Sequence, residues 1–407
     1  MIHEISGGVC AARGFTAAGI HCGVKAGSSP DKNDLALILS EKECAAAATF
    51  TRNKVKAAPL HVTREHIADG RAWGVAANSG NANACCPMSM ENARAMAAAA
   101  AEATGHEASD FAVASTGVIG QTINIAAIEA GIPAAAAKLS REGSGAAATA
   151  IMTTDTVKKE IAISFELGGR EIRMGAIAKG SGMIHPNMGT MLAFITTDCA
   201  ISGPMLDRVL HAVVPRTFNR VTVDGDTSTN DTCLVLANGM AENPEITGEG
   251  EDCSRFAEAL TFVLRHLSRA IAGDGEGASK LVTCIVSGAS DENTAETLSK
   301  SVVGSALVKA AMFGADANWG RVLCAMGYSG AQFDPEGVDV TFRSEAGKVP
   351  VCSRGEAIPF SEEKAKEVLS QKEVIIDVVL REGEGSAECW GCDLTYDYVK
   401  INGDYRT

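Results

Sequence analysis

The segment from Lys179 to Phe194, Lys-Gly-Ser-Gly-Met-Ile-His-Pro-Asn-Met-Gly-Thr-Met-Leu-Ala-Phe, places a threonine directly after a glycine-rich loop. A threonine hydroxyl is a weak nucleophile and needs a base beside it. For Thr190 an economical base is its own α-amine, which exists only after the preceding peptide bond is broken. An α-amino group titrates at about pH 7.7–8.0, so an appreciable fraction is neutral at physiological pH. The segment is therefore a candidate for self-cleavage that yields an N-terminal nucleophile.

Gly189 suits the bond that would be cut. Without a Cβ it tolerates unusual backbone conformations, and β-branching restricts where the Thr190 hydroxyl can point. Attack of Thr190 Oγ1 on the Gly189 carbonyl would form an ester by an N→O acyl shift, and water would then hydrolyse that ester. The same dipeptide also fits the ordinary start of a strand after a loop, so the dipeptide alone leaves both interpretations open.

Several familiar motifs are missing or incomplete in the sequence. It contains no Gly-x-x-x-x-Gly-Lys-Ser/Thr phosphate loop and no Gly-x-Ser-x-Gly nucleophile motif. The glycines of residues 273–277 have the wrong spacing for a dinucleotide-binding loop. Residues 224–228 begin like a calcium loop, but Thr229 and Val235 occupy the positions of its turn glycine and its bidentate glutamate. We predict none of these chemistries.

The cysteines and histidines give weaker signals. Cys389 and Cys392 form a Cys-x-x-Cys pair, but zinc needs two more ligands and none is evident nearby. Buried free thiols more often behave as small hydrophobes. His61 and His66 lack the upstream cysteine pair of a zinc finger, which favours ordinary surface residues. His185, in the loop before the threonine, is the one histidine retained as a functional candidate.

The composition indicates a soluble globular protein of 407 residues, 46% hydrophobic and 21% charged. A net charge of −14 and the lack of a dense Lys/Arg run argue against a nucleic-acid partner. No apolar stretch reaches the roughly 18 residues of a membrane helix. The 13 cysteines are scattered, and the start has no basic and apolar signal regions. We therefore expect a reduced, cytoplasmic protein without membrane contact.

Apolar patterning predicts strands and helices in both halves of the chain, with the 179–186 loop as the main break. The expected strands are 34–40, 74–78, 111–114, 191–197, 281–286, 338–343, 373–380 and 394–401, together with a hairpin across 160–178 that turns at Gly168-Gly169. The expected helices are 88–104, 122–139, 253–271 and one that begins near Pro204 after Ser202. This order lacks the strict alternation of a doubly wound sheet.

The run from Lys179 to Leu192 resembles the cleavage signature of the ornithine acetyltransferase family, which comprises arginine biosynthesis bifunctional proteins and glutamate N-acetyltransferases. Other segments similar to this family follow in the family's order and span nearly the whole chain. They are Thr116–Gly120, Ile151–Thr156, Val223–Asp231, Gly275–Lys280, Ala317–Arg321 and Trp390–Thr407. Together these segments make the resemblance highly specific.

The resemblance implies roles for individual residues. Thr190 would be the nucleophile, acetylated during turnover, after cleavage between Gly189 and Thr190. Thr116 and Gly117 would form the oxyanion hole, because a hydroxyl and a backbone N–H can converge on a developing negative charge. The implied substrate contacts are Thr153, Lys179, Thr190, Glu276, Asn402 and Thr407.

The charged members of this set match the groups of an amino-acid substrate. Lys179 suits an α-carboxylate, and Glu276 suits an amino group. Two departures from the family pattern stand out. The family usually has alanine where this chain has Gly189, and the loop Asn78–Cys86 departs at Ser79 and Cys86. We assign no function to Ser79 or Cys86 from the sequence.

The resemblance further implies an α/β fold with helices packed around β-sheets. The precursor would be cut into an α chain (1–189), which carries the oxyanion hole, and a β chain (190–407), and these would assemble as an α2β2 heterotetramer. The implied reaction is ping-pong transfer of acetyl from N2-acetyl-L-ornithine to L-glutamate, with acetyl-CoA as an alternative donor in some members. No metal and no tightly bound cofactor are implied.

Two alternatives remain at this point. In a self-processing aminopeptidase or amidase of related architecture, water would replace glutamate as the acceptor. A non-enzymatic thiol or zinc protein would instead depend on Cys389 and Cys392.

Overall fold

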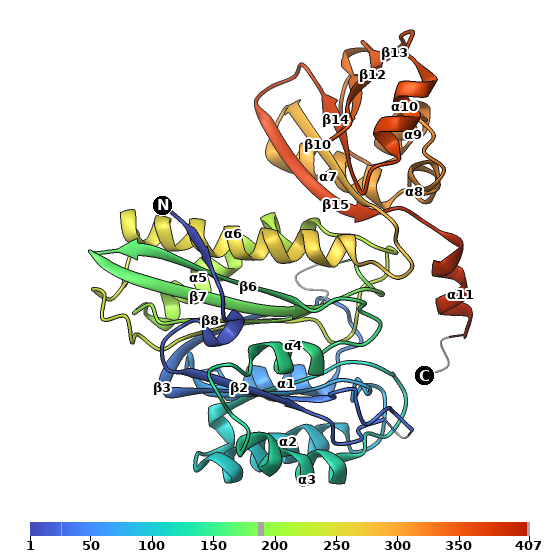
Figure 1. Ribbon diagram of the computed structural model, residues 1–407. Coiled ribbons are helices and arrows are strands. Elements are labelled where there is room, and N and C mark those ends of the chain that lie inside the picture. The colour runs from blue at the N-terminus through green and yellow to red at the C-terminus, as the bar shows by residue number, and fades with distance from the viewer. Residues whose placement is uncertain (26, 186–190, 405–407) are drawn as a thin grey trace.

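The computed structural model describes residues 1–25, 27–185 and 191–404, and it contains two β-sheets (Figure 1). The larger sheet has nine strands in the order β1-β6-β7-β8-β9-β3-β4-β5, and β2 also pairs with β3. Its strands are β1 (His3–Ile5), β2 (Phe15–Ile20), β3 (Leu35–Phe50), β4 (Arg71–Asn78), β5 (Phe111–Ser115), β6 (Lys159–Leu167), β7 (Arg170–Lys179), β8 (Leu192–Thr197) and β9 (Thr232–Ala237).

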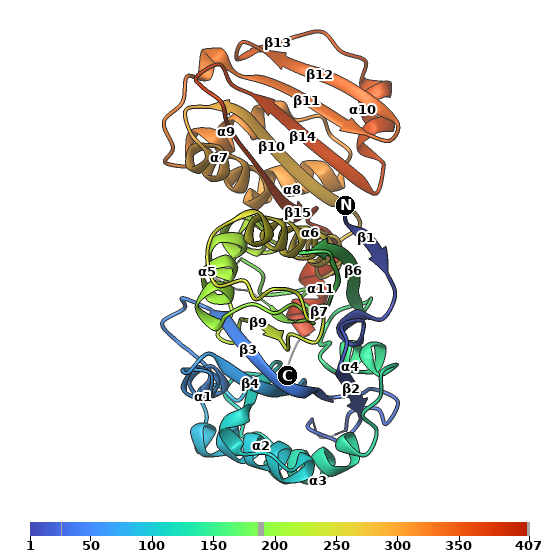
Figure 2. The same ribbon diagram turned by 90° about the vertical axis from the view of Figure 1, so that its left-hand side faces the viewer.

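The long strand β3 folds this sheet into two layers. Residues 35–40 of β3 pair with β2, whereas residues 45–50 pair with β9. The part of the sheet around β2, β4 and β5 thereby comes to lie over the part around β7, β8 and β9 (Figure 2). Phe15, Val75 and Phe194 belong to one buried cluster that both parts share. This cluster is the core between the layers.

Helices cover the two outer faces of the folded sheet. α1 (Ala58–His66), α2 (Ser89–Thr104) and α3 (Ile125–Ala136) pack on the β2–β5 part, and α5 (Gly203–Val213) and α6 (Glu251–Gly273) pack on the β6–β9 part. The short α4 (Ser144–Ala150) contributes Ala147 and Ala148 to the core between the layers. The result is a helix–sheet–sheet–helix arrangement, visible from top to bottom in the lower body of Figure 2.

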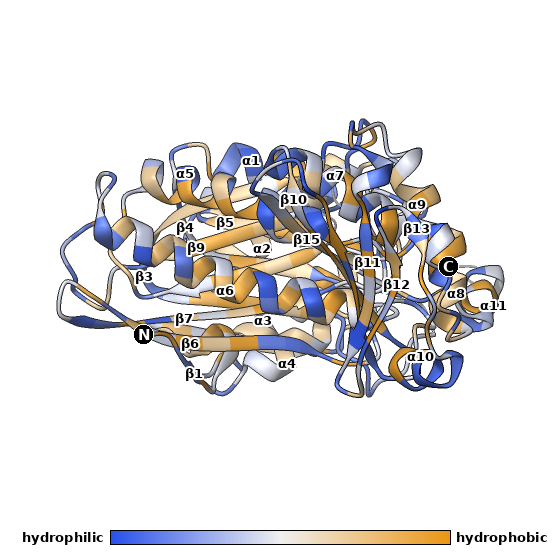
Figure 3. Cartoon of the chain, turned by 90° about the horizontal axis from the view of Figure 1, so that it is seen from above, coloured by the Kyte–Doolittle hydropathy of each residue, from blue (hydrophilic) through white to orange (hydrophobic). Residues whose placement is uncertain are grey.

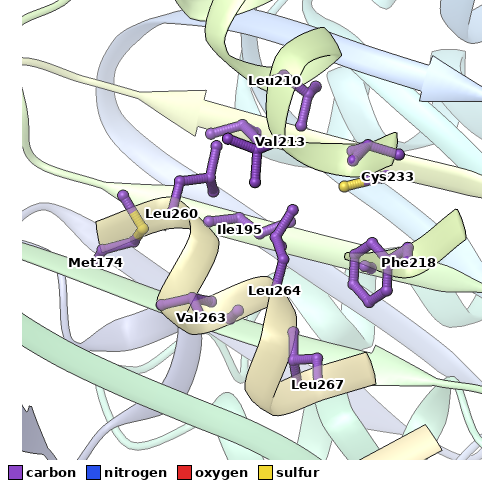
Figure 4. Close-up of a cluster of buried hydrophobic side chains, with 14 of the residues drawn as sticks. Met174, Ile195, Leu210, Val213, Phe218, Cys233, Leu260, Val263, Leu264 and Leu267 are labelled. Carbon is purple, nitrogen blue, oxygen red and sulfur yellow. The ribbon is translucent and has the colours of Figure 1, made fainter. Parts of the chain in front are cut away.

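The packing of α6 shows why this arrangement is stable. Leu260, Val263, Leu264 and Leu267 recur at helical spacing and meet Ile195 of β8 in a fully buried cluster (Figure 4). The strands beneath are coloured largely hydrophobic in Figure 3, whereas α6 shows both hydrophilic and hydrophobic residues along its length. Among the described residues no helix, α6 included, is long and apolar enough to cross a membrane.

A second body follows α6 and contains the smaller sheet, whose strand order is β13-β12-β11-β14-β10-β15. Its strands are β10 (Leu281–Ala289), β11 (Asp339–Ser344), β12 (Gly347–Ser353), β13 (Glu356–Ala357), β14 (Glu373–Val379) and β15 (Gly385–Cys392). Its helices are α7 (Glu292–Gly304), α8 (Ala306–Phe313), α9 (Trp319–Gly327) and α10 (Glu362–Leu369). The two bodies meet where the ends of β10 and β15 contact α6.

The last helix, α11 (Tyr396–Asp404), leaves the second body and runs back along the side of the first (Figure 1). The Thr395 hydroxyl donates to the Gly277 carbonyl at 2.6 Å. The start of α11 is thus held beside Gly277.

The predicted cut between the α and β chains falls between β7 and β8, which are antiparallel neighbours in the larger sheet. β8 also pairs with β9, and β9 pairs with β3. The two strands of the predicted β chain, β8 and β9, therefore lie between strands of the predicted α chain in one sheet. The boundary between the two bodies lies elsewhere, near residue 280.

The predicted α/β fold class is confirmed, and most predicted elements are present, including the hairpin of β6 and β7 with its turn at Gly168 and Gly169. The strand predicted at 394–401 is wrong, because those residues form most of α11. The strand nearby is instead β15, which the prediction missed. β15 contains two glycines and no β-branched residue, so its strand propensity is low. Its pairing with β10 nevertheless stabilises it as a strand.

Candidate active site

The turn after β5 is positioned by the parallel pairing of β4 and β5, which end at the same edge with Asn78 opposite Ser115. The Ser115 hydroxyl donates to Asn78 Oδ1 at 2.6 Å, and the Asn78 amide donates to the Asn81 carbonyl at 3.0 Å. The Thr116 N–H donates to the Asn78 carbonyl at 3.0 Å. These bonds fix the turn that carries the predicted oxyanion hole.

Gly117 occupies a backbone conformation that favours glycine, with φ +127°. A Cβ at this position would lie 2.4 Å from the Gly80 carbonyl carbon and 2.6 Å from the Asn81 nitrogen. Within the described part of the chain, no hydrogen bond occupies the Gly117 N–H. This N–H is therefore available to a developing oxyanion, as the prediction requires.

Asn230, which belongs to the predicted β chain, holds the same turn of the predicted α chain. Its amide donates to the Ser115 carbonyl at 2.8 Å and to the Ala82 carbonyl at 2.7 Å. Two residues later, the Thr232 N–H donates to the Met191 carbonyl at 2.9 Å. Asn230 therefore connects the Thr116–Gly117 turn to the strand that begins after Thr190. Our sequence analysis gave Asn230 no role, although it lies in one of the family-like segments.

A narrow cavity brings two of the predicted residues together. Thr116 and Lys179 line it, with Met191, Asn230 and Asp231 among its other walls. Gly189 and Thr190 lie outside the described residues, but Thr190 is bonded directly to Met191. The walls of the cavity therefore reach to within one residue of the predicted nucleophile.

Lys179 is a buried cation at the end of β7. Its Nζ lies 3.5 Å from the Thr153 hydroxyl. Burial lowers the pKa of Lys179, and the nearby carboxylates of Asp155, Asp231 and Glu276 oppose that shift. A bound carboxylate would add one more negative neighbour and would favour the ammonium form further.

A buried ion network holds Lys179 and Thr153 in place. Asp155 accepts from Lys159 Nζ and from the Gly180 N–H, both at 2.7 Å, and from the Thr153 N–H at 3.1 Å. Burial alone would raise the pKa of Asp155, but Lys159 and Lys179 outweigh burial and lower it. Lys159 Nζ also contacts an Asp274 carboxylate oxygen at 2.5 Å. The network was missed because Gly180 and Asp274 join it from distant parts of the sequence.

We expect Lys159→Met to destabilise the protein by about 3–5 kcal/mol, because it leaves the carboxylates of Asp155 and Asp274 buried without their cation. The measurement is chemical denaturation of the purified protein. Lys158→Met is the matched control. Lys158 is exposed and pairs with Glu160 at 2.6 Å, so its loss should cost about 1 kcal/mol or less. Equal stabilities of the two variants would contradict the importance of the network.

Glu276 lies against the glycine-rich loop and reaches the last helix. A Cβ on Gly182 would fall within 2.4 Å of the Glu276 carboxylate, so a side chain at position 182 would displace that carboxylate. The Glu276 N–H donates to the Ser181 carbonyl at 3.1 Å. Asn402 donates its amide to Glu276 Oε2 at 2.7 Å. The predicted contacts Glu276 and Asn402 are therefore neighbours, whereas Thr407 lies outside the described residues.

His185 lies near these residues but does not line their cavity. Its Nδ1 is 3.0 Å from the Thr222 hydroxyl, and it borders a separate pocket with Glu296 and Lys300. Burial, with a smaller effect of Lys300, lowers its pKa to about 4. A histidine that is neutral at physiological pH and bonded to Thr222 is best explained as an anchor of the loop.

Cys389 and Cys392 do not converge on one site. Cys389 belongs to the core of the smaller sheet, where its Sγ lies 3.1 Å from the Ser299 hydroxyl. Cys392 belongs to the core beneath α6, where its Sγ lies 3.3 Å from Lys309 Nζ. In the described ranges, no three His, Cys, Asp or Glu side chains are grouped so as to hold a metal ion. This geometry does not favour the zinc or thiol alternative.

The site as a whole offers three kinds of group within a small volume. Thr116 and Gly117 offer hydrogen-bond donors, Lys179 offers a positive charge, and Glu276 offers a negative one. Such a set can bind a zwitterionic amino acid and stabilise the oxyanion of an acyl-transfer intermediate. It needs one nucleophile to complete it.

Comparisons with known proteins agree along almost the whole chain. The model of the ArgJ family matches residues 16–407. The arginine biosynthesis bifunctional protein ArgJ of Symbiobacterium thermophilum is 52% identical over 404 residues, which is 99% of this chain and 99% of that protein. The protein of the same name from Caldanaerobacter subterraneus is 49% identical over 396 residues, 97% of each chain.

Two solved structures are also similar. The crystal structure of arginine biosynthesis bifunctional protein ArgJ from Bacillus halodurans is 45% identical with a TM-score of 0.49, over 52% of this chain and 98% of that chain. An ornithine acetyltransferase complexed with ornithine, from Mycobacterium tuberculosis, is 37% identical with a TM-score of 0.42, over 46% of this chain and 99% of that chain.

Proposed function

Because the chain belongs to the ArgJ family, whose members are enzymes of acetyl transfer in arginine biosynthesis, we propose that it moves an acetyl group from N2-acetyl-L-ornithine to L-glutamate through an acetyl ester on Thr190. The enzyme is an acyltransferase. Cleavage between Gly189 and Thr190 precedes transfer in this proposal, because it frees the α-amine that serves Thr190 as its base.

One observation carries the proposal: the cavity lined by Thr116 and Lys179 continues to Met191, next to the predicted nucleophile. Thr116, a predicted oxyanion donor, Lys179, the cation proposed for an α-carboxylate, and Met191 therefore border one space. Glu276, in the segment between α6 and β10, lies near Lys179 and is bonded to Asn402 of the last helix.

In each half of the reaction, the proton that is removed from the attacking group is returned to the leaving group. Thr190 Oγ1 attacks the acetyl carbonyl carbon of acetylornithine, and the α-amine of Thr190 takes the hydroxyl proton. Thr116 and Gly117 stabilise the oxyanion until the C–N bond breaks, and the α-ammonium returns the proton to the departing ornithine amine. Glutamate then attacks the acetyl ester through its amino group, and the same steps run in reverse to release N-acetylglutamate and free Thr190.

The experiment that tests this function varies the acceptor. Purified enzyme is incubated with acetylornithine, with and without glutamate, while ornithine, acetate and acetylglutamate are measured. We expect steady ornithine release only when glutamate is present, with one acetylglutamate formed per ornithine. Equal turnover without glutamate, with acetate as product, would contradict transfer and would support the amidase alternative.

Acetyl-CoA as a second acetyl donor and an α2β2 assembly are further parts of the proposal. Formation of acetylglutamate from acetyl-CoA tests the first, and the mass of the native complex tests the second. Association of the two chains after cleavage is supported by two strand pairings between them: β8 is hydrogen-bonded to β7, and β9 to β3, of the predicted α chain.

A further inference from the structure

A second pocket adjoins the turn that carries Gly117, and Met191 is not among its lining residues. Its walls include Lys25, Lys32, Asp34, Ser79, Gly117 and Thr153, and it encloses about 100 Å³. Gly117 and Thr153 are predicted members of the active site, so the pocket borders two residues of that site. None of Lys25, Lys32 and Ser79 has a role in the reaction as described above.

The pocket has an excess of positive charge. Lys32 Nζ donates to the Thr153 carbonyl at 3.0 Å, which holds this ammonium at the pocket wall, and Lys25 is a second lysine that lines the pocket. The opposing carboxylate is that of Asp34. It is already bound by the backbone N–H groups of Cys22, Gly23 and Val24 at 2.7, 3.0 and 2.9 Å. A carboxylate with three such donors is largely satisfied, which leaves the ammonium groups to attract an anion.

Ser79 adds an unused hydrogen-bonding group to the same wall. Its side chain is 1% exposed, and its hydroxyl has no hydrogen-bond partner in the described structure. A buried hydroxyl without a partner is costly and is uncommon in folded proteins.

Thr153 lies between this pocket and Lys179. Its carbonyl accepts from Lys32 Nζ at 3.0 Å, and its hydroxyl lies 3.5 Å from Lys179 Nζ. The ammonium groups of Lys32 and Lys179 thus both contact Thr153, one at its carbonyl and the other at its hydroxyl. A short dicarboxylate can span such a pair, with one carboxylate at each ammonium, whereas an amino acid with a cationic side chain cannot.

We propose that Lys32, with Lys25 and the Ser79 hydroxyl, forms the subsite for the side-chain carboxylate of the acceptor glutamate. The inference rests on the proposed function, in which Lys179 binds the α-carboxylate. Ornithine has an ammonium at the end of its side chain, and the Glu276 carboxylate, bonded to Asn402 at 2.7 Å, offers it the opposite charge. Donor and acceptor would thus share Lys179 and place their side chains in different subsites.

The test compares glutamate with glutamine, which has nearly the same shape but no side-chain charge. The enzyme is acetylated with acetylornithine, and kcat/KM is measured for each acceptor with wild type and with Lys25→Met/Lys32→Met. We expect the double variant to lose about 10- to 100-fold in kcat/KM for glutamate, the scale of a charged hydrogen bond, and to change little for glutamine. Ser79→Ala should lower the same ratio by a smaller factor.

Lys348→Met is the control for loss of a surface lysine, because Lys348 is exposed on β12 of the second body and its replacement removes one positive charge far from the pocket. It should keep the wild-type glutamate-to-glutamine ratio. Acetyl-enzyme formation from acetylornithine is measured separately for every variant. Normal acetylation with an unchanged ratio in the double variant would overturn the subsite alone. Failure of wild type to become acetylated would overturn the proposed function, and the subsite with it.

Discussion

We expect Thr190→Ala to leave the chain as one polypeptide and to abolish acetyl transfer. Wild type should give two fragments, residues 1–189 and 190–407, whose masses sum to that of the 42.1 kDa precursor plus one water. The variant lacks the hydroxyl that attacks the Gly189 carbonyl, so the ester that precedes hydrolysis cannot form. It also lacks the nucleophile of transfer, and removal of a catalytic nucleophile costs about 10⁶-fold in rate. Intact-mass spectrometry and an acetylornithine–glutamate assay measure both effects.

Thr190→Ser is the matched control, because it keeps the hydroxyl and removes only the methyl group. It should still cut itself and transfer acetyl, at a lower rate, since the methyl group limits the positions of the hydroxyl. Gly189→Ala introduces the alanine that the family usually has at this position, and the variant should also be processed.

A full-length, uncut but active wild type would contradict the proposal that cleavage supplies the base. An uncut but stable Thr190→Ala protein would show that folding does not depend on the cut.

Local patterns predicted those elements whose stability is largely local. The hairpin of β6 and β7 was predicted from two apolar runs joined by Gly168-Gly169, and both glycines have the positive φ of such a turn. α6 was predicted from its helical spacing, and its apolar side is the side that is buried.

The errors occur where distant contacts decide the conformation. β3 was predicted to end near residue 40 but continues to Phe50 through an alanine-rich stretch of low strand propensity, because β9 pairs with it there. Residues 396–404 contain strand-favouring Tyr, Val and Ile but form α11, whose Asn402 bonds Glu276 across 126 residues of sequence. No local pattern carries such contacts.

The same division applies to the candidate site. The family-like segments pointed to Thr116, Lys179 and Glu276, and the structure brings these residues to one region. The groups that hold them there were not predicted. Lys159 reaches Asp274 across 115 positions, and Asn230 reaches Ser115 across the same number. A sequence shows which groups can do chemistry, but the bonds that position them are defined only when the chain has folded.

The second large effect concerns the oxyanion hole, where we expect Thr116→Val to lower kcat by about 100- to 1000-fold with little change in stability. Valine keeps the shape of threonine and removes only the hydroxyl, and the loss of one oxyanion donor has this scale. Because Thr116 is buried and its backbone N–H remains bonded to Asn78, the turn should keep its conformation. Steady-state kinetics measure kcat, and thermal denaturation measures stability. A wild-type kcat would exclude the hydroxyl from the mechanism.

Gly117→Ala should affect the same donor pair through the backbone and should be the more severe change. Its Cβ would lie 2.4 Å from a backbone carbon of Gly80, so the turn has to move and the Gly117 N–H moves with it. Gly120→Ala is the matched control, since Gly120 also has positive φ, +82°, but has no atom within 4 Å of an added Cβ. The two variants share backbone strain and differ in the clash.

Because self-cleavage also passes through an oxyanion at the Gly189 carbonyl, Gly117→Ala should slow the cut and the transfer together, whereas Gly120→Ala should preserve both. Loss of transfer with normal cleavage in Gly117→Ala would mean that the two steps use different donors.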